Sequence, residues 1–181
     1  MLNETKFWAM IEQSRSGAVK RGLKGDDVLD DQEKVLAAEL GKLSPEEIVD
    51  FNERFYELHA SAYVWKLWGA AYWLGGGCGN DGFTDFRATL ISLGEKRFKQ
   101  AVNDPDSLAE IVGQPDVPYL QGEGFQYVAG NAYKKKTGKE IPLGKSSRRK
   151  DPLGEKWDFD DFDETEERLP KLVEKFPEMG D

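Results

Sequence analysis

Apolar residues recur at helical spacing along most of the chain. Phe7 and Ile11 lie one helical turn apart, with Trp8 and Met10 beside them, so the sequence predicts a short amphipathic helix near the N-terminus. A second apolar stripe follows two acids that suit the positive end of a helix dipole, and Gly41 is expected to end that helix. Its apolar members are Val28, Leu29, Val35, Leu36 and Leu40, and the polar Gln32 fills a gap in the stripe.

The clearest local signal is the start of the next helix. Ser44 can cap it, Pro45 suits the first helical position, and Glu47 can reach back to complete a capping box. The apolar stripe that follows consists of Ile48, Phe51, Phe55, Leu58 and Ala62. Because the apolar run continues, with room for a kink, as far as Leu74, we expect a long central helix from Ser44 to Leu74.

Glycines and prolines divide the rest of the chain into shorter helices. The triplet Gly75 to Gly77 is expected to end the central helix, because glycine loses much backbone entropy in a helix. Four further helices are predicted: one that starts at Asn80 or Asp81 and carries Phe86, Leu90, Ile91, Leu93 and Phe98, one from Ser107 to Val112, one with Phe125, Val128, Ala132 and Tyr133 that ends at Gly138, and one from Glu164 to Phe176 that Pro170 breaks or kinks.

These patterns predict a mainly α-helical fold. No alternating apolar and polar run is long enough to predict a substantial sheet. A chain of 181 residues with 39% hydrophobic side chains can bury one ordinary core. We therefore expect a single helical domain over residues 1–181, a bundle around the central helix, with an acidic C-terminal segment. Residues 139–163 are predicted to form a long polar loop and an acidic segment within that domain.

The charge of the chain narrows the classes of partner. The formal net charge is −9, which disfavours contact with nucleic-acid phosphates and with anionic lipid. We therefore expect neither a nucleic acid nor a membrane as partner, and a basic protein would be attracted. The alternative interpretation is that the charge serves solubility alone.

The cysteine content and the N-terminal sequence indicate the cellular compartment in which the protein is expected. Cys78 is the single cysteine, so no intrachain disulfide can form, which fits a reducing compartment. The N-terminus lacks a basic start followed by an apolar run, and no apolar run approaches the roughly 20 residues that span a bilayer. We therefore expect a cytoplasmic protein.

The segment from Cys78 to Arg87 is the candidate site. The preceding glycines leave backbone N–H groups uncovered beside a helix start, where an anion can bind, although the Lys and Ser/Thr of a nucleotide P-loop are missing. Asp81 and Asp85 are four residues apart and share a helix face, as a cation site or an acid–base pair would require. The alternatives are a glycine hinge, one helix cap and one surface acid. Arg87 is expected to pair with an acid from another helix.

A cysteine nucleophile is a further hypothesis. Cys78 lies near the predicted helix start, where a thiolate is favoured, and His59, the single histidine, would have to be its base. The competing interpretation is that His59 is a packed side chain on a strongly patterned helix. Cysteine and histidine are too few for a tetrahedral site, so we expect neither a metal nor a cofactor.

Aromatic side chains precede the glycines. Trp65, Trp68 and Tyr72 are spaced i, i+3 and i+7, so they form one stripe on the helix. Core packing is the common use of such a stripe, because each ring buries a large area. A stripe beside a glycine loop and acids also fits the wall of a ligand pocket.

The motifs of this region carry a resemblance. The central block reads W-x-L-W-G-A-A-Y and then G-G-G-C-x-x-D-G-F-x-x-F-R-x-x-L-I-S-x-G, and the chain also contains L-S-P-E-E-I-x-x-F, D-P-D-S-L-A-E and G-E-x-W-D-F-D-D. In these motifs, nearly the whole chain resembles an uncharacterised bacterial family of unknown function. Many relatives carry Cys-Ser-Asp-Asp where this chain has Cys78-Gly79-Asn80-Asp81, which argues against a two-acid metal site here. The resemblance implies a small bacterial cytoplasmic protein without an established activity.

Two functional hypotheses remain open. The first is a non-enzymatic, acidic interaction or regulatory protein, motivated by the charge and by the lack of a recognisable catalytic set. The second is an enzyme or small-ligand binder that uses the Cys78–Arg87 loop together with the aromatic stripe. In that case Arg87 would hold an anionic ligand, and Asp81 or Asp85 would act as the base.

Overall fold

The computed structural model describes residues 2–142 and 150–177, and within these ranges it contains helices and no strand. The helices are α1 (Glu4–Lys20), α2 (Asp26–Lys42), α3 (Pro45–Ser61), α4 (Trp65–Gly75), α5 (Asn80–Ser92), α6 (Glu95–Asn103), η1 (Pro105–Ser107), α7 (Leu108–Ile111), η2 (Phe125–Tyr127), α8 (Val128–Thr137), α9 (Phe162–Arg168) and α10 (Pro170–Lys175). The mainly α-helical fold predicted from the sequence is confirmed. None of the described helices is long and apolar enough to cross a membrane.

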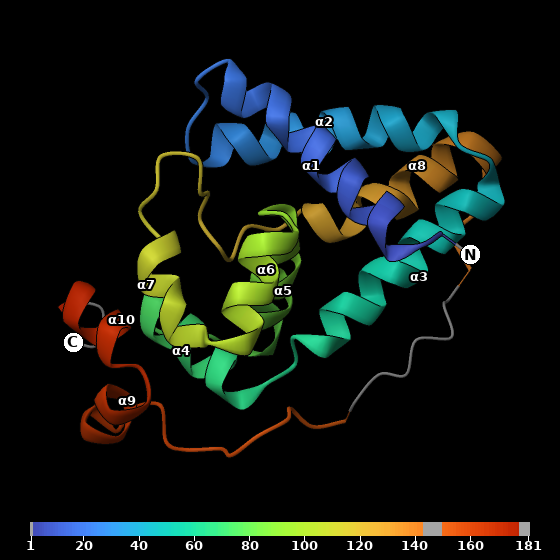
Figure 1. The fold of residues 1–181 in the computed structure, drawn as a ribbon. Helices are drawn as coiled ribbons and strands as arrows, with labels where there is room; N and C mark the ends of the chain where they lie inside the picture. The colour runs from blue at the N-terminus through green and yellow to red at the C-terminus, as the bar shows by residue number, and fades with distance from the viewer. Residues whose placement is uncertain (1, 143–149, 178–181) are drawn as a thin grey trace.

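Helices α1, α2, α3 and α8 form one side of the molecule. Helices α1 and α2 pack as a hairpin, and α8 returns late in the sequence to pack against both α2 and α3 (Figure 1). The predicted capping box at the start of α3 is confirmed. The Ser44 hydroxyl accepts from the Glu47 N–H at 3.2 Å, and the Glu47 carboxylate accepts from the Ser44 N–H at 3.0 Å.

The predicted central helix is two helices. The chain is extended at Val64, with φ −134° and ψ 133°, so α3 ends at Ser61 and α4 begins at Trp65. The break is held by Leu153, which accepts from the Trp65 N–H at 2.8 Å and donates its own N–H to the Tyr63 carbonyl at 2.9 Å. These bonds satisfy backbone groups that a continuous helix would have paired internally. A segment about ninety positions further along the chain therefore decides where α3 ends.

A second predicted helix is also divided. The apolar residues from Phe86 to Phe98 lie on α5 and α6, which meet at Gly94. Gly94 has φ +94°, and a Cβ there would lie 2.1 Å from Oε1 of Glu12, so this turn requires glycine. Near the C-terminus, Pro170 separates α9 from α10, as the expected break predicts, and it occupies the first turn of α10.

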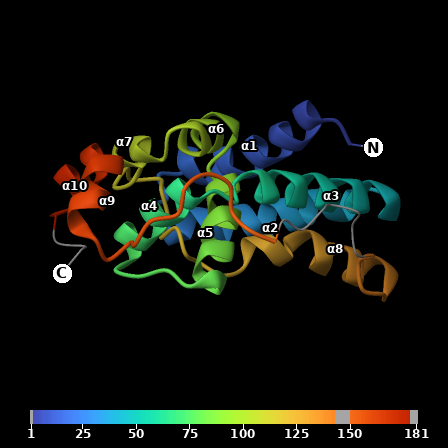
Figure 2. The ribbon, with the colours of Figure 1, turned by 90° about the horizontal axis from the view of Figure 1, so that it is seen from below.

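The C-terminal segment is part of the core. From residue 150 the chain runs beneath α4 and α5 and then folds into α9 and α10 beside α7 (Figure 2). Trp157 is 5% exposed, and Leu169 and Leu172 are fully buried. The Asp106 carboxylate accepts from the Leu172 N–H at 2.9 Å and so satisfies the first turn of α10. This docking places residues 156–160 against the aromatic stripe of α4.

Candidate functional site

The glycine loop folds back onto α4. Gly76 adopts a left-handed conformation at the end of the helix, and the Gly77 N–H donates to the Tyr72 carbonyl at 2.9 Å. The Trp68 indole donates to the Cys78 carbonyl at 2.8 Å and stacks on Phe83 of α5, with 4.8 Å between ring centroids. Trp68 therefore fixes the bend that brings the start of α5 beside the end of α4.

The C-terminal segment of the chain covers the aromatic stripe of α4. Trp65 and Trp68 stack in parallel with 5.3 Å between their ring centroids. Phe159 of the C-terminal segment contacts all three rings of the stripe, at centroid distances of 6.2 Å to Trp65, 6.4 Å to Trp68 and 5.4 Å to Tyr72. The wall that the sequence predicts is thus occupied by Phe159, and its Tyr72 end faces a cavity that the C-terminal segment helps to form.

Arg87 is buried, and its hydrogen bonds go to neutral oxygens. Its Nε donates to the Phe83 carbonyl at 3.2 Å, Nη1 to the His59 carbonyl at 3.0 Å and Nη2 to the Thr84 hydroxyl at 3.4 Å. The expectation of an acidic partner from another helix is wrong, since the contact made across helices is with the last turn of α3. The carbonyl end of a helix attracts a cation, which supplies the physical reason.

The surroundings of Arg87 are largely apolar. Its guanidinium lies 4.7 Å from the ring centroid of Tyr63 and 4.9 Å from that of Phe83. Burial lowers the pKa of Arg87 to about 10, so the side chain remains charged at neutral pH. Arg87 therefore joins α3 to α5 as a cation held between a helix end and two ring faces.

His59 and Cys78 make no hydrogen bond to each other within the described part of the chain. The His59 Nε2–H donates to the Thr84 carbonyl at 3.0 Å, and burial, aided by the charge of Arg87, lowers the pKa of His59 to about 4. Burial likewise raises the pKa of the Cys78 thiol to about 11, which outweighs the nearby positive charge of Arg87. The expectation that the helix start favours a thiolate is wrong, because desolvation dominates. At neutral pH the imidazole is neutral and the thiol is protonated.

The two aspartates of α5 differ in environment. Asp81 is exposed, whereas Asp85 is 7% exposed and accepts a hydrogen bond from Gln126 at 2.6 Å. Burial, with smaller contributions from Glu123 and Asp81, raises the pKa of Asp85. The predicted cap at Asn80 or Asp81 is wrong, since Gly79 occupies the cap position of α5 without a side-chain bond. No cluster of three or more potential metal ligands exists within residues 2–142 and 150–177.

A cavity of about 470 Å³ lies beside Tyr72. Among the residues that line it, Tyr72 alone was predicted from the sequence as a site residue. The cavity is open to solvent and lined by Tyr72, Lys156, Trp157, Asp158, Phe159 and Asp160. The Tyr72 hydroxyl donates to the Asp160 carboxylate at 2.6 Å. The alternation of aromatic and acidic residues from Trp157 to Asp163 was the one sequence feature that could have indicated the other lining residues. Helical spacing alone does not predict which ring of α4 contacts such a segment.

The family model described as "Protein of unknown function (DUF4240)" matches residues 2–135. The chain belongs to the DUF4240 family. No curated protein and no solved structure matches the chain. The DUF4240 match contains the whole predicted site from Trp65 to Arg87 and ends before the segment that completes the cavity.

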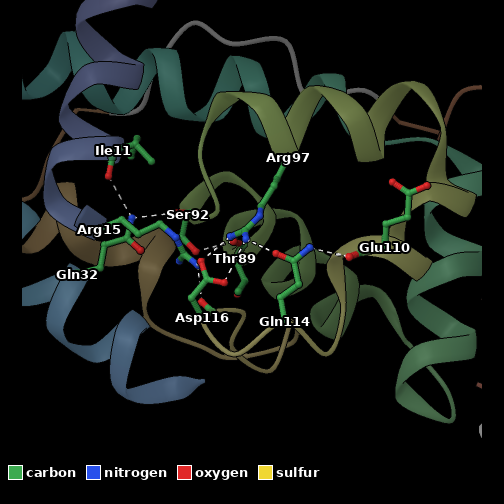
Figure 3. A network of polar contacts seen from close by, with 9 residues as sticks. All are labelled: Ile11, Arg15, Gln32, Thr89, Ser92, Arg97, Glu110, Gln114 and Asp116. Atoms are coloured by element: carbon green, nitrogen blue, oxygen red, sulfur yellow. Dashed lines mark hydrogen bonds and ion pairs between the residues drawn. The ribbon is translucent and has the colours of Figure 1, made fainter. Parts of the chain in front are cut away.

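A second polar cluster, which was not predicted from the sequence, lies within the DUF4240 region. The Asp116 carboxylate accepts from Arg15 of α1 at 2.9 Å and from Arg97 of α6 at 2.8 Å (Figure 3). The Arg15 side chain is only 5% exposed, and its Nη1 has no partner among the described residues. Arg15 follows Ile11 by one helical turn and so lies on the buried face of α1. A cation at such a position was the one feature of the sequence that could have predicted the cluster. The cluster joins α1, α6 and the turn that carries Asp116.

Proposed function

We propose that the chain is a non-catalytic interaction protein of the bacterial cytoplasm that binds a basic protein through its C-terminal side. The single observation that supports this most is the open cavity between Tyr72 and residues 156–160, which combines aromatic walls with two carboxylates. A single, half-buried cysteine fits a reducing compartment. The motifs shared with the bacterial family support the origin.

The cavity lies within an acidic face of the molecule. This acidic face consists of exposed side chains of the C-terminal segment, namely Asp158, Asp160, Asp161, Asp163, Glu166 and Glu167. Phe162 lies among them and is 48% exposed. Negative charge steers a basic partner and sets its orientation, while an exposed ring adds apolar area to bury.

The segment from Cys78 to Arg87, which lies mostly on α5, offers less support for catalysis. Its thiol is protonated at neutral pH, the nearby imidazole is neutral, and Arg87 is engaged by three oxygens. These contacts suit a joint between α3 and α5. A ligand at this loop, with Asp85 as base, stays a prediction, and a thermal-shift screen of anions, nucleotides and metabolites tests it.

The basic-partner proposal is tested with a fluorescently labelled, unstructured lysine-rich peptide. We expect saturable binding by fluorescence anisotropy that weakens as salt rises, because exposed charges are screened. Neutralising Asp163, Glu166 and Glu167 together, as Asp163→Asn, Glu166→Gln and Glu167→Gln, should weaken binding by about fivefold, since each exposed charge contributes a few tenths of a kcal/mol.

The matched control removes three exposed acids elsewhere. Asp27, Asp30 and Glu46 are exposed on α2 and α3. The variant Asp27→Asn, Asp30→Asn, Glu46→Gln has the same net charge as the test variant and should bind the peptide like the wild type. Equal weakening in both variants would mean that only net charge matters. Absence of binding at low salt would contradict the proposal outright.

A further inference from the structure

The cavity is built by a closed turn packed on α4. Within residues 156–161, the Asp158 carboxylate accepts from the Asp160 N–H at 3.1 Å, and the Asp158 carbonyl accepts from the Asp161 N–H at 3.0 Å. Trp157 anchors the turn, because its indole donates to Thr165 at 3.0 Å and its ring lies against Gly69. The carboxylates of Asp158 and Asp160 are therefore presented by a turn whose backbone is fixed.

Both carboxylates lie near the Tyr72 hydroxyl. The hydrogen bond to Asp160, followed by burial and by the charges of Asp160 and Asp158, raises the pKa of Tyr72. Each carboxylate uses one oxygen in a bond to the turn or to Tyr72. The second oxygen of each accepts no hydrogen bond from any described residue, so each carboxylate has an acceptor left for a ligand.

The rings complete the walls of a cation site. Phe159 lies 5.4 Å from Tyr72 and 4.8 Å from Trp157 between ring centroids, and the latter pair meets edge to face. Aromatic faces attract cations, and adjacent carboxylates strengthen this preference. The chain already uses this chemistry nearby, since Nζ of Lys156 lies 5.1 Å from the centroid of the Trp65 ring.

We propose that this cavity binds the ammonium or guanidinium end of a lysine or arginine side chain of the partner. This inference rests on the proposed function and names the anchor point on the acidic face. The lining holds the two carboxylates and one cation, Lys156, whose ammonium lies over the Trp65 ring. The charge of the lining is therefore net negative, which disfavours an anion, and the described acids provide no three-ligand cluster for a metal. A long cationic side chain matches the cavity because its methylene stem packs on rings while its charged end meets carboxylates.

The test uses small probes on the full-length protein. n-Butylammonium, n-butylguanidinium and the neutral n-butanol are titrated while the tryptophan indole N–H signals are followed by NMR. We expect both cations to shift the Trp157 signal with millimolar affinity, about tenfold tighter than n-butanol. The variant Asp158→Asn/Asp160→Asn should remove this discrimination, yet it retains the oxygens that accept from the turn and from Tyr72.

The control variant Asp163→Asn/Glu166→Gln removes two charges of the same face outside the cavity. It should keep the preference for the cations. The proposal is overturned if n-butanol binds the wild type as tightly as n-butylammonium, if the control loses the preference equally, or if calcium chloride reproduces the same shifts. If the lysine-rich peptide still binds Asp158→Asn/Asp160→Asn as tightly as wild type, the cavity is wrong as the anchor while the basic-partner function stands. If the cations bind but the peptide never does, the partner proposal fails instead.

Discussion

At the scale of single residues, Arg87 shows how a buried cation can serve the fold. Its guanidinium donates to the last turn of α3 and to the first turns of α5, and it is 7% exposed. A buried charge is costly unless its donors are satisfied and compensating dipoles surround it. The helix end and the two ring faces supply that compensation, so the side chain stabilises the junction of α3 and α5.

Replacing Arg87 tests this structural role. Arg87→Met should lower the free energy of unfolding by about 1 to 3 kcal/mol, because the His59 carbonyl loses its buried donor. Urea unfolding of the purified variant measures the change. Asp81→Asn, on the exposed part of the same helix, should change stability by less than about 0.5 kcal/mol. An Arg87→Met protein as stable as wild type would favour a ligand-binding role for the guanidinium.

The buried His59 makes the free energy of unfolding decrease as the pH falls. Its pKa falls from 6.5 in the unfolded chain to about 4 in the fold. Between these values the unfolded chain binds a proton that the folded chain does not, so stability is complete above pH 6.5 and falls as the pH drops to about 4. The loss should approach about 3 kcal/mol. In His59→Gln, unfolding free energies across this range should lack that slope, and parallel profiles for both proteins would contradict the assignment.

The spacing of residues in the sequence predicted only those parts of the candidate site in which the contacting side chains lie on the same helix. Helical geometry alone sets Trp65, Trp68 and Tyr72 on one stripe, and in the structure the first two rings stack directly while Phe159 contacts all three. The partners of these rings could not be predicted, because Phe159 approaches from a distant segment. The same holds for Arg87, whose acceptor on α3 depends on how α3 and α5 cross. Burial, which sets the protonation of Cys78, also becomes visible only in the fold.

At the scale of helices, the capping box of α3 was predicted correctly, whereas the cap of α5 and the helix lengths were not. Ser44 and its capping box depend on four consecutive residues, so the start of α3 was predicted correctly. The end of α3 depends on Leu153, which competes for the backbone of Tyr63 and Trp65. The apolar pattern across residues 62–64 is the same for one helix or two, so local sequence could not separate these outcomes.

Two glycines within helices test the packing of the C-terminal segment. A Cβ at Gly69 of α4 would lie 2.2 Å from the buried Trp157 ring, whereas a Cβ at Gly41 of α2 would meet nothing within 4 Å. Gly41→Ala should raise stability by up to about 1 kcal/mol through helix propensity. Gly69→Ala gains the same propensity, yet it should lower stability by roughly 1 to 3 kcal/mol because Trp157 must move.

Thermal and urea unfolding of both alanine variants measure the contrast. The Gly69→Ala protein should also show a changed Trp157 indole signal by NMR, while the Gly41→Ala signal should match that of the wild type. Equal stabilisation by the two substitutions would mean that residues 156–160 do not pack on α4 as described.

At the scale of the whole molecule, the Asp116 carboxylate links helices that are far apart in the sequence. Asp116 neutralises Arg15 of α1 and Arg97 of α6, and these two side chains lower the pKa of Asp116 to about 2. Asp116→Asn keeps the shape of the side chain but leaves two cations without their acid. We expect a loss of about 3 kcal/mol in urea unfolding, against little change for the exposed Asp27→Asn. A loss no larger than that of Asp27→Asn would show that the cluster does not join α1 to α6.

We propose that the working surface of the molecule lies around Tyr72 and the acidic face, and that the segment from Cys78 to Arg87 is a structural joint. Mapping the lysine-rich peptide onto isotope-labelled protein by NMR tests it most directly. We predict that the largest shift changes fall on the Trp157 indole, on residues 158–160 and on α9. Changes centred on residues 78–87, with the C-terminal segment unaffected, would contradict this account.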